Sequence, residues 1–214
     1  MIRHTMNVGD TLLVHEEKKF PDLEMKARYG KDWGNYCHQK HHVEAFCRME
    51  QPRNPYINPL YRHSKGKFGS ADLQVVEIGG GFGMMRRLFH DWGLDSEYTI
   101  VDLPEFCILQ RWYLESHGIF DTEWMSLDDF VWSNRRWDLL IACWSLSEIE
   151  VRPEPTFFDK AEDYLIAYQK HHDGLPFSNV DWFNKFKAEI PRTWVEEEIS
   201  FLPGNLYLMG QSNG

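Results

Sequence analysis

The feature that most constrains this chain is the segment of residues 75–83 (VVEIGGGFG), in which apolar residues lead directly into closely spaced glycines. A short apolar run that ends at glycines predicts a buried strand followed by a tight turn. Glycine lacks a Cβ atom, so the backbone of this turn can lie flat against a ligand. Residues 84–92 predict a helix that ends at Gly93. The first turn of that helix presents free N–H groups and the positive end of its dipole to the same place.

The spacing of the glycines excludes two nucleotide-binding motifs. The dinucleotide fingerprint GxGxxG needs a glycine at its sixth position, where this chain has Met84 or Arg86. The phosphate-binding P-loop needs Gly-Lys-Ser/Thr, and no such triplet follows. The motif that is present has an acidic residue followed by a glycine at every second position: Glu77, Gly79, Gly81 and Gly83.

From residue 69 onward, short apolar runs alternate with amphipathic stretches, which predicts a mostly parallel sheet with helices on both faces. The expected strands are residues 73–78, 98–103, 120–124, 138–144 and 164–168. The period of residues 164–168 fits a strand or a helix. Alternating residues at 195–201, a turn at 203–205 and a returning run at 206–209 predict an antiparallel hairpin at the end of the chain.

Two further helices are expected between these strands. One begins at Pro104, a good first helical residue, and ends before Gly118. Its apolar stripe is expected at Phe106, Leu109, Tyr113 and Leu114. The other covers residues 179–190, with Ser178 or Asn179 as its N-cap and Pro191 beyond its end.

Residues 1–68 are polar and weakly periodic, so we expect an N-terminal helical cap over 1–68 and an α/β domain over 69–214. The apolar fraction of 43% is that of a globular protein. A net charge of −10 disfavours a nucleic-acid partner. The chain has no signal-peptide segment and no apolar run long enough to span a membrane. Its four cysteines form no CxxC pair. We therefore expect a cytoplasmic protein with no membrane partner.

Together these motifs resemble those of the class I S-adenosylmethionine-dependent methyltransferases over residues 70–210. The glycine segment is similar to the first motif of that family. Asp102 matches the acidic residue that binds the ribose hydroxyls, and residues 126–129 (SLDD) resemble the acidic turn near the adenine. Residues 138–144 (DLLIACW) resemble the fourth strand, whose carboxyl end faces the methyl group. The terminal hairpin resembles the reversed last strand.

The resemblance implies a Rossmann-like fold, with a mostly parallel seven-stranded sheet, helices on both faces and a C-terminal antiparallel hairpin. It also implies S-adenosyl-L-methionine as cofactor and a set of residues that bind it: Glu77, Gly79, Gly80, Gly81, Gly83, Asp102, Leu103, Asp128 and Trp144. Some members of the family use a divalent metal, but the sequence shows no clear set of metal ligands, so we expect none.

Three segments are similar to a bacterial group of sugar O-methyltransferases: residues 101–105 with 109–114, residues 144–148 (WSLSE), and residues 58–62 (NPLYR). This likeness implies a small-molecule acceptor, such as a sugar, whose hydroxyl is methylated. The residues expected to contact the acceptor are Tyr61, Arg62, Ser145 and Ser147. The general bases expected to take its proton are Glu148, His171 and His172. The sequence leaves the oligomeric state open.

Several of these residues also have purely structural interpretations. Asp102 could cap the helix at Pro104, and Asp128 or Asp129 could cap a short helix. Ser145 and Glu148 have the spacing of a capping box. His38, His41 and His42, with Cys37 and Cys47, lack the spacing of a zinc site, so we expect surface histidines there.

Three alternative functions also fit the sequence. One is an N- or C-methyltransferase of a small metabolite. Another is a catalytically silent cofactor-binding subunit. The third, an aminopropyl transferase on the same fold, is disfavoured because no polyamine-type acidic motif is present beyond Asp102.

Overall fold

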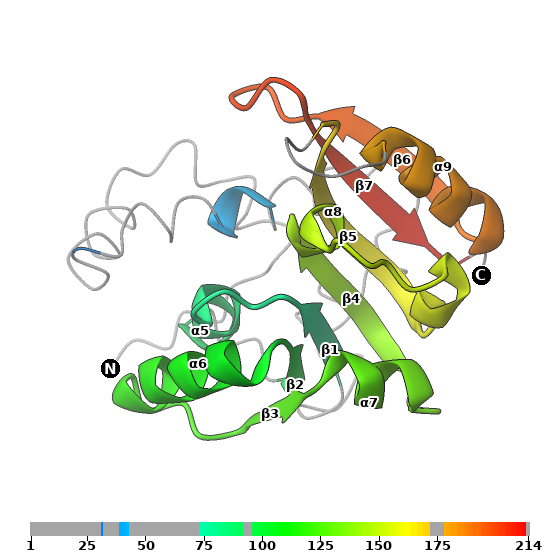
Figure 1. Ribbon diagram of the computed structural model, residues 1–214. Helices are drawn as coiled ribbons and strands as arrows, with labels where there is room; N and C mark the ends of the chain where they lie inside the picture. The colour runs from blue at the N-terminus through cyan, green and yellow to red at the C-terminus, as the bar shows by residue number, and fades with distance from the viewer. Residues whose placement is uncertain (1–30, 32–38, 43–72, 92–95, 172–177, 213–214) are drawn as a thin grey trace.

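The computed structural model describes residues 31, 39–42, 73–91, 96–171 and 178–212 (Figure 1). Its strands are β1 (Leu73–Ile78), β2 (Ser96–Val101), β3 (Thr122–Met125), β4 (Trp137–Cys143), β5 (Ala161–Gln169), β6 (Thr193–Glu198) and β7 (Asn205–Gln211). Its helices are α5 (Met84–Asp91), α6 (Pro104–Ser116), α7 (Leu127–Trp132), α8 (Ser145–Glu148), the 3-10 helix η2 (Pro155–Phe158) and α9 (Asn179–Glu189).

The seven strands form one sheet in the order β3-β2-β1-β4-β5-β7-β6. Strands β1 to β5 are parallel, and β7 pairs antiparallel with both β5 and β6. The expected mostly parallel sheet with a terminal hairpin is therefore confirmed. The ambiguous segment at residues 164–168 is strand β5.

Helices cover both faces of the sheet because successive residues of each buried strand point to opposite sides. One core contains Val75 and packs against α5 and α6. The other contains Val76 and packs against α7, η2 and α9. The sequence segments that are apolar on both faces, β1 and β4, lie in the middle of the sheet.

Two expectations for local structure need correction. The third strand is Thr122–Met125, while Phe120 is 73% exposed before it. The buried face of α6 consists of Gln110, Tyr113 and Leu114, and Phe106 and Leu109 are exposed. The helix turns this face inward because Leu114 packs against the glycine turn and Gln110 hydrogen-bonds to it.

The N-terminal segment is described only in part. Residue 31 and residues 39–42 are helical, and the remainder of the expected cap over 1–68 lies outside the described residues. Gly93, the expected end of α5, also lies outside them. Among the helices that the structure describes, none is both long and apolar enough to cross a membrane.

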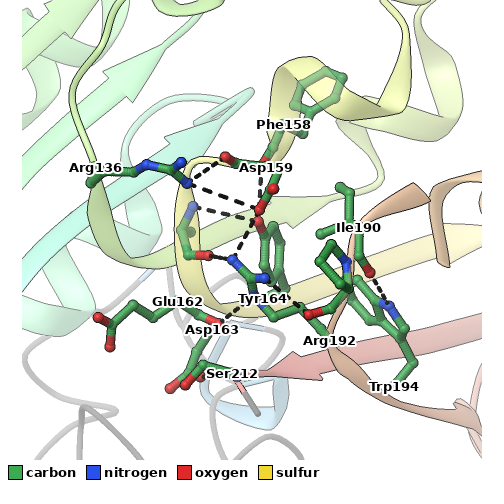
Figure 2. Close-up of polar contacts among 12 residues, drawn as sticks. Arg136, Phe158, Asp159, Glu162, Asp163, Tyr164, Ile190, Arg192, Trp194 and Ser212 are labelled. Atoms are coloured by element: carbon green, nitrogen blue, oxygen red, sulfur yellow. Dashed lines mark hydrogen bonds and ion pairs between the residues drawn. The ribbon is translucent and has the colours of Figure 1, made fainter. Parts of the chain in front are cut away.

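Ion pairs and hydrogen bonds hold the amino ends of β4 and β5 together (Figure 2). The Arg192 guanidinium pairs with Asp159 at 2.9 Å and donates to the carbonyl oxygen of Ala161 at 2.6 Å. A cavity of about 440 Å³ at this edge is lined by Arg136, Glu162, Arg192 and neighbouring residues. The arginines of this cavity contact carboxylates and carbonyl oxygens of the protein itself. These contacts therefore stabilise the fold, and we assign no ligand to this edge.

Candidate active site

The cofactor-binding residues expected from the sequence come together at the carboxyl edge of the sheet, where ligands bind in open α/β folds. The glycine turn follows β1, Asp102 follows β2 and Trp144 follows β4, and these three parallel strands are neighbours (Figure 1). The amide of Gly79 donates to the carbonyl oxygen of Val101 at 2.8 Å, which joins the first two of these segments.

The glycines of the turn are there for different reasons. Gly79, Gly81 and Gly83 have φ angles of 74°, 57° and 96°, a region that L-residues with side chains rarely adopt. A Cβ on Gly79 would lie 2.3 Å from the Cβ of Ser145, and one on Gly83 would lie 3.1 Å from Leu114. Among the residues that the structure describes, none has an atom within 4 Å of a Cβ built on Gly81. Packing therefore explains Gly79 and Gly83, whereas no described residue packs on Gly81.

A buried glutamine links the turn to Asp102. The Nε2 atom of Gln110 donates to the carbonyl oxygen of Gly81 at 3.0 Å and to Oδ2 of Asp102 at 2.7 Å. Gly80 leaves room for this contact, since a Cβ there would lie 3.3 Å from Nε2 of Gln110 and 2.7 Å from Ile100. Gln110 is not among the site residues expected from the sequence. The sequence feature that could have identified Gln110 is its position three residues before Tyr113, which puts a polar side chain on the same buried face of α6.

The carboxylate of Asp102 is oriented rather than free to rotate. Its Oδ1 atom accepts a hydrogen bond from the amide of Leu103 at 2.8 Å. Burial raises the pKa of Asp102 above its usual value, and the hydrogen bonds from Leu103, Gln110 and Gly80 act in the opposite direction. Asp102 does not cap α6, because the N-cap of that helix is Leu103 and no side chain caps it. The structural interpretation of Asp102 as a helix cap is therefore wrong.

Glu77 lies buried beneath the turn. The Tyr98 hydroxyl donates to its Oε2 atom at 2.9 Å. Burial raises the pKa of Glu77 to about 8, the Tyr98 hydrogen bond lowers it, and the charge of Asp102 raises it further. The raised pKa favours the protonated, uncharged form of Glu77.

The turn after β3 contains the acidic pair. Ser126 is the N-cap of α7: its Oγ atom accepts a hydrogen bond from the amide of Asp129 at 3.1 Å. The same hydroxyl donates to the Asp129 carboxylate at 2.6 Å. Asp129 is therefore part of the cap, while Asp128 is exposed at the carboxyl end of β3.

Trp144 makes the turn from β4 into α8 in a strained conformation. Its φ of 65° is the one positive value among the non-glycine residues that the structure describes. Such a conformation costs about 1–3 kcal/mol and persists where the surroundings hold it. The Trp144 amide donates to the carbonyl oxygen of Ala167, and its Nε1 donates to Asn205 Oδ1, both at 2.7 Å.

The two serines after Trp144 hydrogen-bond to the backbone. Ser145 Oγ donates to the carbonyl oxygen of Ile78, and Ser147 Oγ donates to that of Trp144 at 2.7 Å. The expected capping box is not formed, because the N-cap of α8 is Trp144 and makes no side-chain cap bond. Ser147 is fully buried and Ser145 partly so.

The remaining predicted residues are exposed or lie outside the described chain. Glu148 is exposed at the end of α8, and His171 is exposed just beyond β5. His172, Tyr61 and Arg62 lie outside the described residues. In the part of the chain that the structure describes, no three His, Cys, Asp or Glu side chains gather as a metal site would require.

Two histidines expected at the surface lie against the sheet instead. His42 is fully buried, and His41 is partly buried. Their Nδ1 atoms lie 2.7 Å and 3.1 Å, respectively, from the hydroxyl of Tyr207 in β7. The sequence gives no signal for this cluster, because Tyr207 is 165 positions from His42 and 166 positions from His41 along the chain.

Neither a family model nor a curated protein sequence matches the chain. Solved structures do match it. An O-methyltransferase family protein from Burkholderia thailandensis is 13% identical with a TM-score of 0.52, and the match covers 94% of this chain and 71% of that one. The glycopeptide N-methyltransferase MtfA complexed with sinefungin is 10% identical with a TM-score of 0.52, over 70% of this chain and 84% of that one.

A ribosomal protein L11 methylase from Lactobacillus delbrueckii subsp. bulgaricus is 12% identical with a TM-score of 0.50, over 72% of this chain and 80% of that one. At such identities the likeness establishes the fold alone. The chain has the Rossmann-like methyltransferase fold.

Proposed function

We propose that the protein is an S-adenosylmethionine-dependent methyltransferase that transfers a methyl group to the hydroxyl of a small molecule such as a sugar. The observation that carries this proposal is the open space at Gly81, beside a carboxylate that Gln110 holds in place. The names of the matching structures support it, since all three are methyltransferases or methylases and one is complexed with sinefungin.

The residues of the carboxyl edge fit an adenosyl amino acid. No atom of the described residues lies within 4 Å of a Cβ built on Gly81, which supports room for a ligand against the backbone there. Asp102, beside it, offers acceptor oxygens for the two ribose hydroxyls. We assign the adenine to Asp128, which is exposed in the first turn of α7, just after β3. Leu103 and Trp144 provide apolar surface on either side of the turn. When bound, the cofactor supplies an electrophilic methyl group on a positively charged sulfur.

The protein's contribution to such a reaction is alignment and proton transfer. Holding the acceptor oxygen close to the methyl carbon provides much of the acceleration. A hydroxyl also needs a base, because its proton must leave as the new bond forms. Of the bases expected from the sequence, Glu148 and His171 are exposed in this structure.

The charge of the protein bears on the acceptor. With 33 acidic and 23 basic residues the surface repels polyanions and favours a neutral or cationic molecule. A sugar hydroxyl satisfies this condition. We therefore propose a small-molecule acceptor rather than a nucleic acid or a membrane lipid. We also propose that the protein acts in the cytoplasm.

Calorimetric titration with S-adenosylhomocysteine tests the proposal, with NAD as the control ligand because the dinucleotide fingerprint is missing. We expect S-adenosylhomocysteine to bind and NAD not to bind. Incubation with methyl-labelled cofactor and a panel of sugars should then give a labelled sugar. Failure of S-adenosylhomocysteine to bind contradicts the proposal. Binding without transfer to any acceptor favours the silent cofactor-binding subunit.

A further inference from the structure

One side chain joins the two segments that would hold the cofactor. Gln110 is fully buried on the inner face of α6. Its Nε2 atom donates to the carbonyl oxygen of Gly81 at 3.0 Å, in the turn after β1, and to Oδ2 of Asp102 at 2.7 Å, just after β2. Because both acceptors bind one nitrogen, they lie about 5 Å apart. The position of the Asp102 carboxylate relative to the glycine turn therefore depends on Gln110.

The chemistry of an amide gives this group a single orientation. A glutamine amide has two hydrogens on its nitrogen and none on its oxygen. Both partners of Gln110 are acceptors here, since one is a backbone carbonyl and the other a carboxylate. The reversed amide would place its oxygen against these two oxygens and lose both hydrogen bonds. Gln110 therefore uses both hydrogens of Nε2 to connect the turn with the carboxylate.

Fold stability alone does not explain a glutamine at this position. The Oε1 atom of Gln110 is buried and has no hydrogen-bond partner among the residues that the structure describes. A buried acceptor without a partner costs free energy, and an apolar side chain of similar length avoids that cost. What Gln110 adds over such a side chain is the pair of hydrogen bonds to Gly81 and Asp102, which lead to the proposed cofactor site.

The partners of Asp102 determine what kind of ligand its carboxylate can bind. The carboxylate accepts hydrogen bonds from the amides of Leu103 and Gly80 and from Gln110. All three partners are donors, so they favour the ionised form, which only accepts hydrogen bonds. A ligand must then bring its own donors to this carboxylate. Two ribose hydroxyls do so, whereas a phosphorylated ribose brings a negative charge instead.

We propose that Gln110 is a positioning residue that makes the cofactor site specific for a ribose with free hydroxyls, an inference that rests on the function proposed above. Gln110 holds the Asp102 carboxylate at a fixed distance from the Gly81 backbone. A ligand that lies along the turn therefore meets the carboxylate with its sugar. A ligand that lacks the hydroxyls leaves a partly buried charge with fewer partners, which weakens its binding. Gln110 acts through Asp102 and needs no contact with the ligand.

The test measures what the ribose hydroxyls contribute with and without Gln110. The full chain is titrated calorimetrically with S-adenosylhomocysteine and with its 2′,3′-dideoxy analogue. The wild type should bind the analogue at least about 30-fold more weakly, since hydrogen bonds to a charged group are lost. Gln110→Met keeps a side chain of similar length without an N–H donor. In this variant the ratio of the two affinities should be at least about fivefold smaller than in the wild type.

Leu114→Met is the matched control for this variant. It introduces the same residue on the same buried face of α6, and Leu114 makes no hydrogen bond to Asp102 through its side chain. The ratio of the two affinities should therefore stay at the wild-type value in Leu114→Met. A general loosening of α6 would change the ratio in both variants.

Gln110→Glu gives a readout that a merely structural role would not produce. The introduced carboxyl donates to Asp102 only when it is protonated, and when ionised it repels Asp102. Acidification from pH 8 to pH 6 should therefore strengthen the binding of S-adenosylhomocysteine to this variant about tenfold relative to the wild type. Glu77 of β1 and Cys107 of α6 also respond to the charge of Asp102. Both are present in the two proteins, so the difference between the two pH profiles is the quantity to compare.

The outcomes separate the role of Gln110 from the proposed function. Equal affinity ratios in the wild type and Gln110→Met, or parallel pH profiles of the wild type and Gln110→Glu, overturn the inference while the proposed function stands. Equal binding of both ligands to the wild type also overturns it, because the ribose hydroxyls are then not recognised. If Gln110→Met fails to fold by circular dichroism, the pH profiles decide. Failure of S-adenosylhomocysteine to bind the wild type overturns the proposed function and the inference with it.

Discussion

Gly79, Gly81 and Gly83 have the same spacing and positive φ angles, yet only at Gly81 would an added Cβ meet none of the described residues within 4 Å. The sequence predicts that glycines are needed in this turn, because the motif requires positive φ angles. It does not predict which glycine faces a ligand, since that depends on Ser145 and Leu114, which come from α8 and α6. Gln110 was missed for the same reason: its partners are brought to it by the fold.

Gly81→Val tests the open position. A valine side chain would occupy the space assigned to the cofactor, so binding of S-adenosylhomocysteine should fall by at least about 100-fold. The matched control is Gly118→Val. Gly118 also has a positive φ, 77°, and no atom of the described residues within 4 Å of its notional Cβ, so both variants carry similar backbone strain. Equal, wild-type affinities in calorimetry would mean that the turn has been misassigned.

Asp102→Ala tests the carboxylate. Removing a charged hydrogen-bond acceptor should weaken the binding of S-adenosylhomocysteine by about 1–3 kcal/mol. Glu105→Ala is the control, since it removes the same charge from an exposed position at the start of α6. If calorimetry shows that both variants bind S-adenosylhomocysteine as tightly as the wild type does, the role assigned to Asp102 is refuted.

Glu77→Gln tests the buried carboxyl through the pH dependence of stability. The pKa of Glu77 is about 8 in the folded chain against an ordinary 4.5. Above pH 4.5 the unfolded chain loses a proton that the folded chain keeps, so Glu77 lowers stability progressively as the pH rises toward 8. Below pH 4.5 this loss is absent. The total effect is at most about 5 kcal/mol.

Denaturant unfolding of the wild type and Glu77→Gln between pH 5 and pH 8 measures this effect. The free energy of unfolding of the variant should exceed that of the wild type by an amount that grows with pH, because glutamine keeps the Tyr98 hydrogen bond without titrating. Parallel curves would show that Glu77 is ionised in the folded protein.

At the scale of elements, the strands and the terminal hairpin could be predicted because their apolar periods match what the sheet buries. The buried face of α6 could not, since Gln110 is buried for its hydrogen bonds while Phe106 and Leu109 are exposed. The strained turn at Trp144 also has no sequence signal. Hydropathy alone thus predicts which elements form and leaves open how a helix is rotated against the site.

Gly79→Ala tests how α8 packs on the glycine turn. A methyl group at this position would lie 2.3 Å from Ser145 Cβ. The clash, together with the positive φ, should lower the free energy of unfolding by about 2–4 kcal/mol. Adding Ser145→Gly removes the clash, so a double-mutant cycle by denaturant unfolding should show favourable coupling. Additive effects would mean that α8 does not rest on Gly79.

At the scale of the whole molecule, the parallel order of β2, β1 and β4 gathers residues from separate segments at one edge. The resemblance stated from sequence was sufficient to predict this fold and the position of the glycine turn. The contacts of His41 and His42 with Tyr207 could not be predicted, because they join opposite ends of the chain and no periodicity links them. Residues 31 and 39–42 are the described part of the expected N-terminal cap, and its extent stays a prediction.

A crystal structure of the full chain with S-adenosylhomocysteine tests the central claim most directly. The account predicts ligand density across Gly81, with the ribose hydroxyls on the Asp102 carboxylate and the sulfur directed toward Trp144. Density elsewhere, or a glycine turn covered by the protein's own side chains with Asp102 facing away from it, would contradict the account.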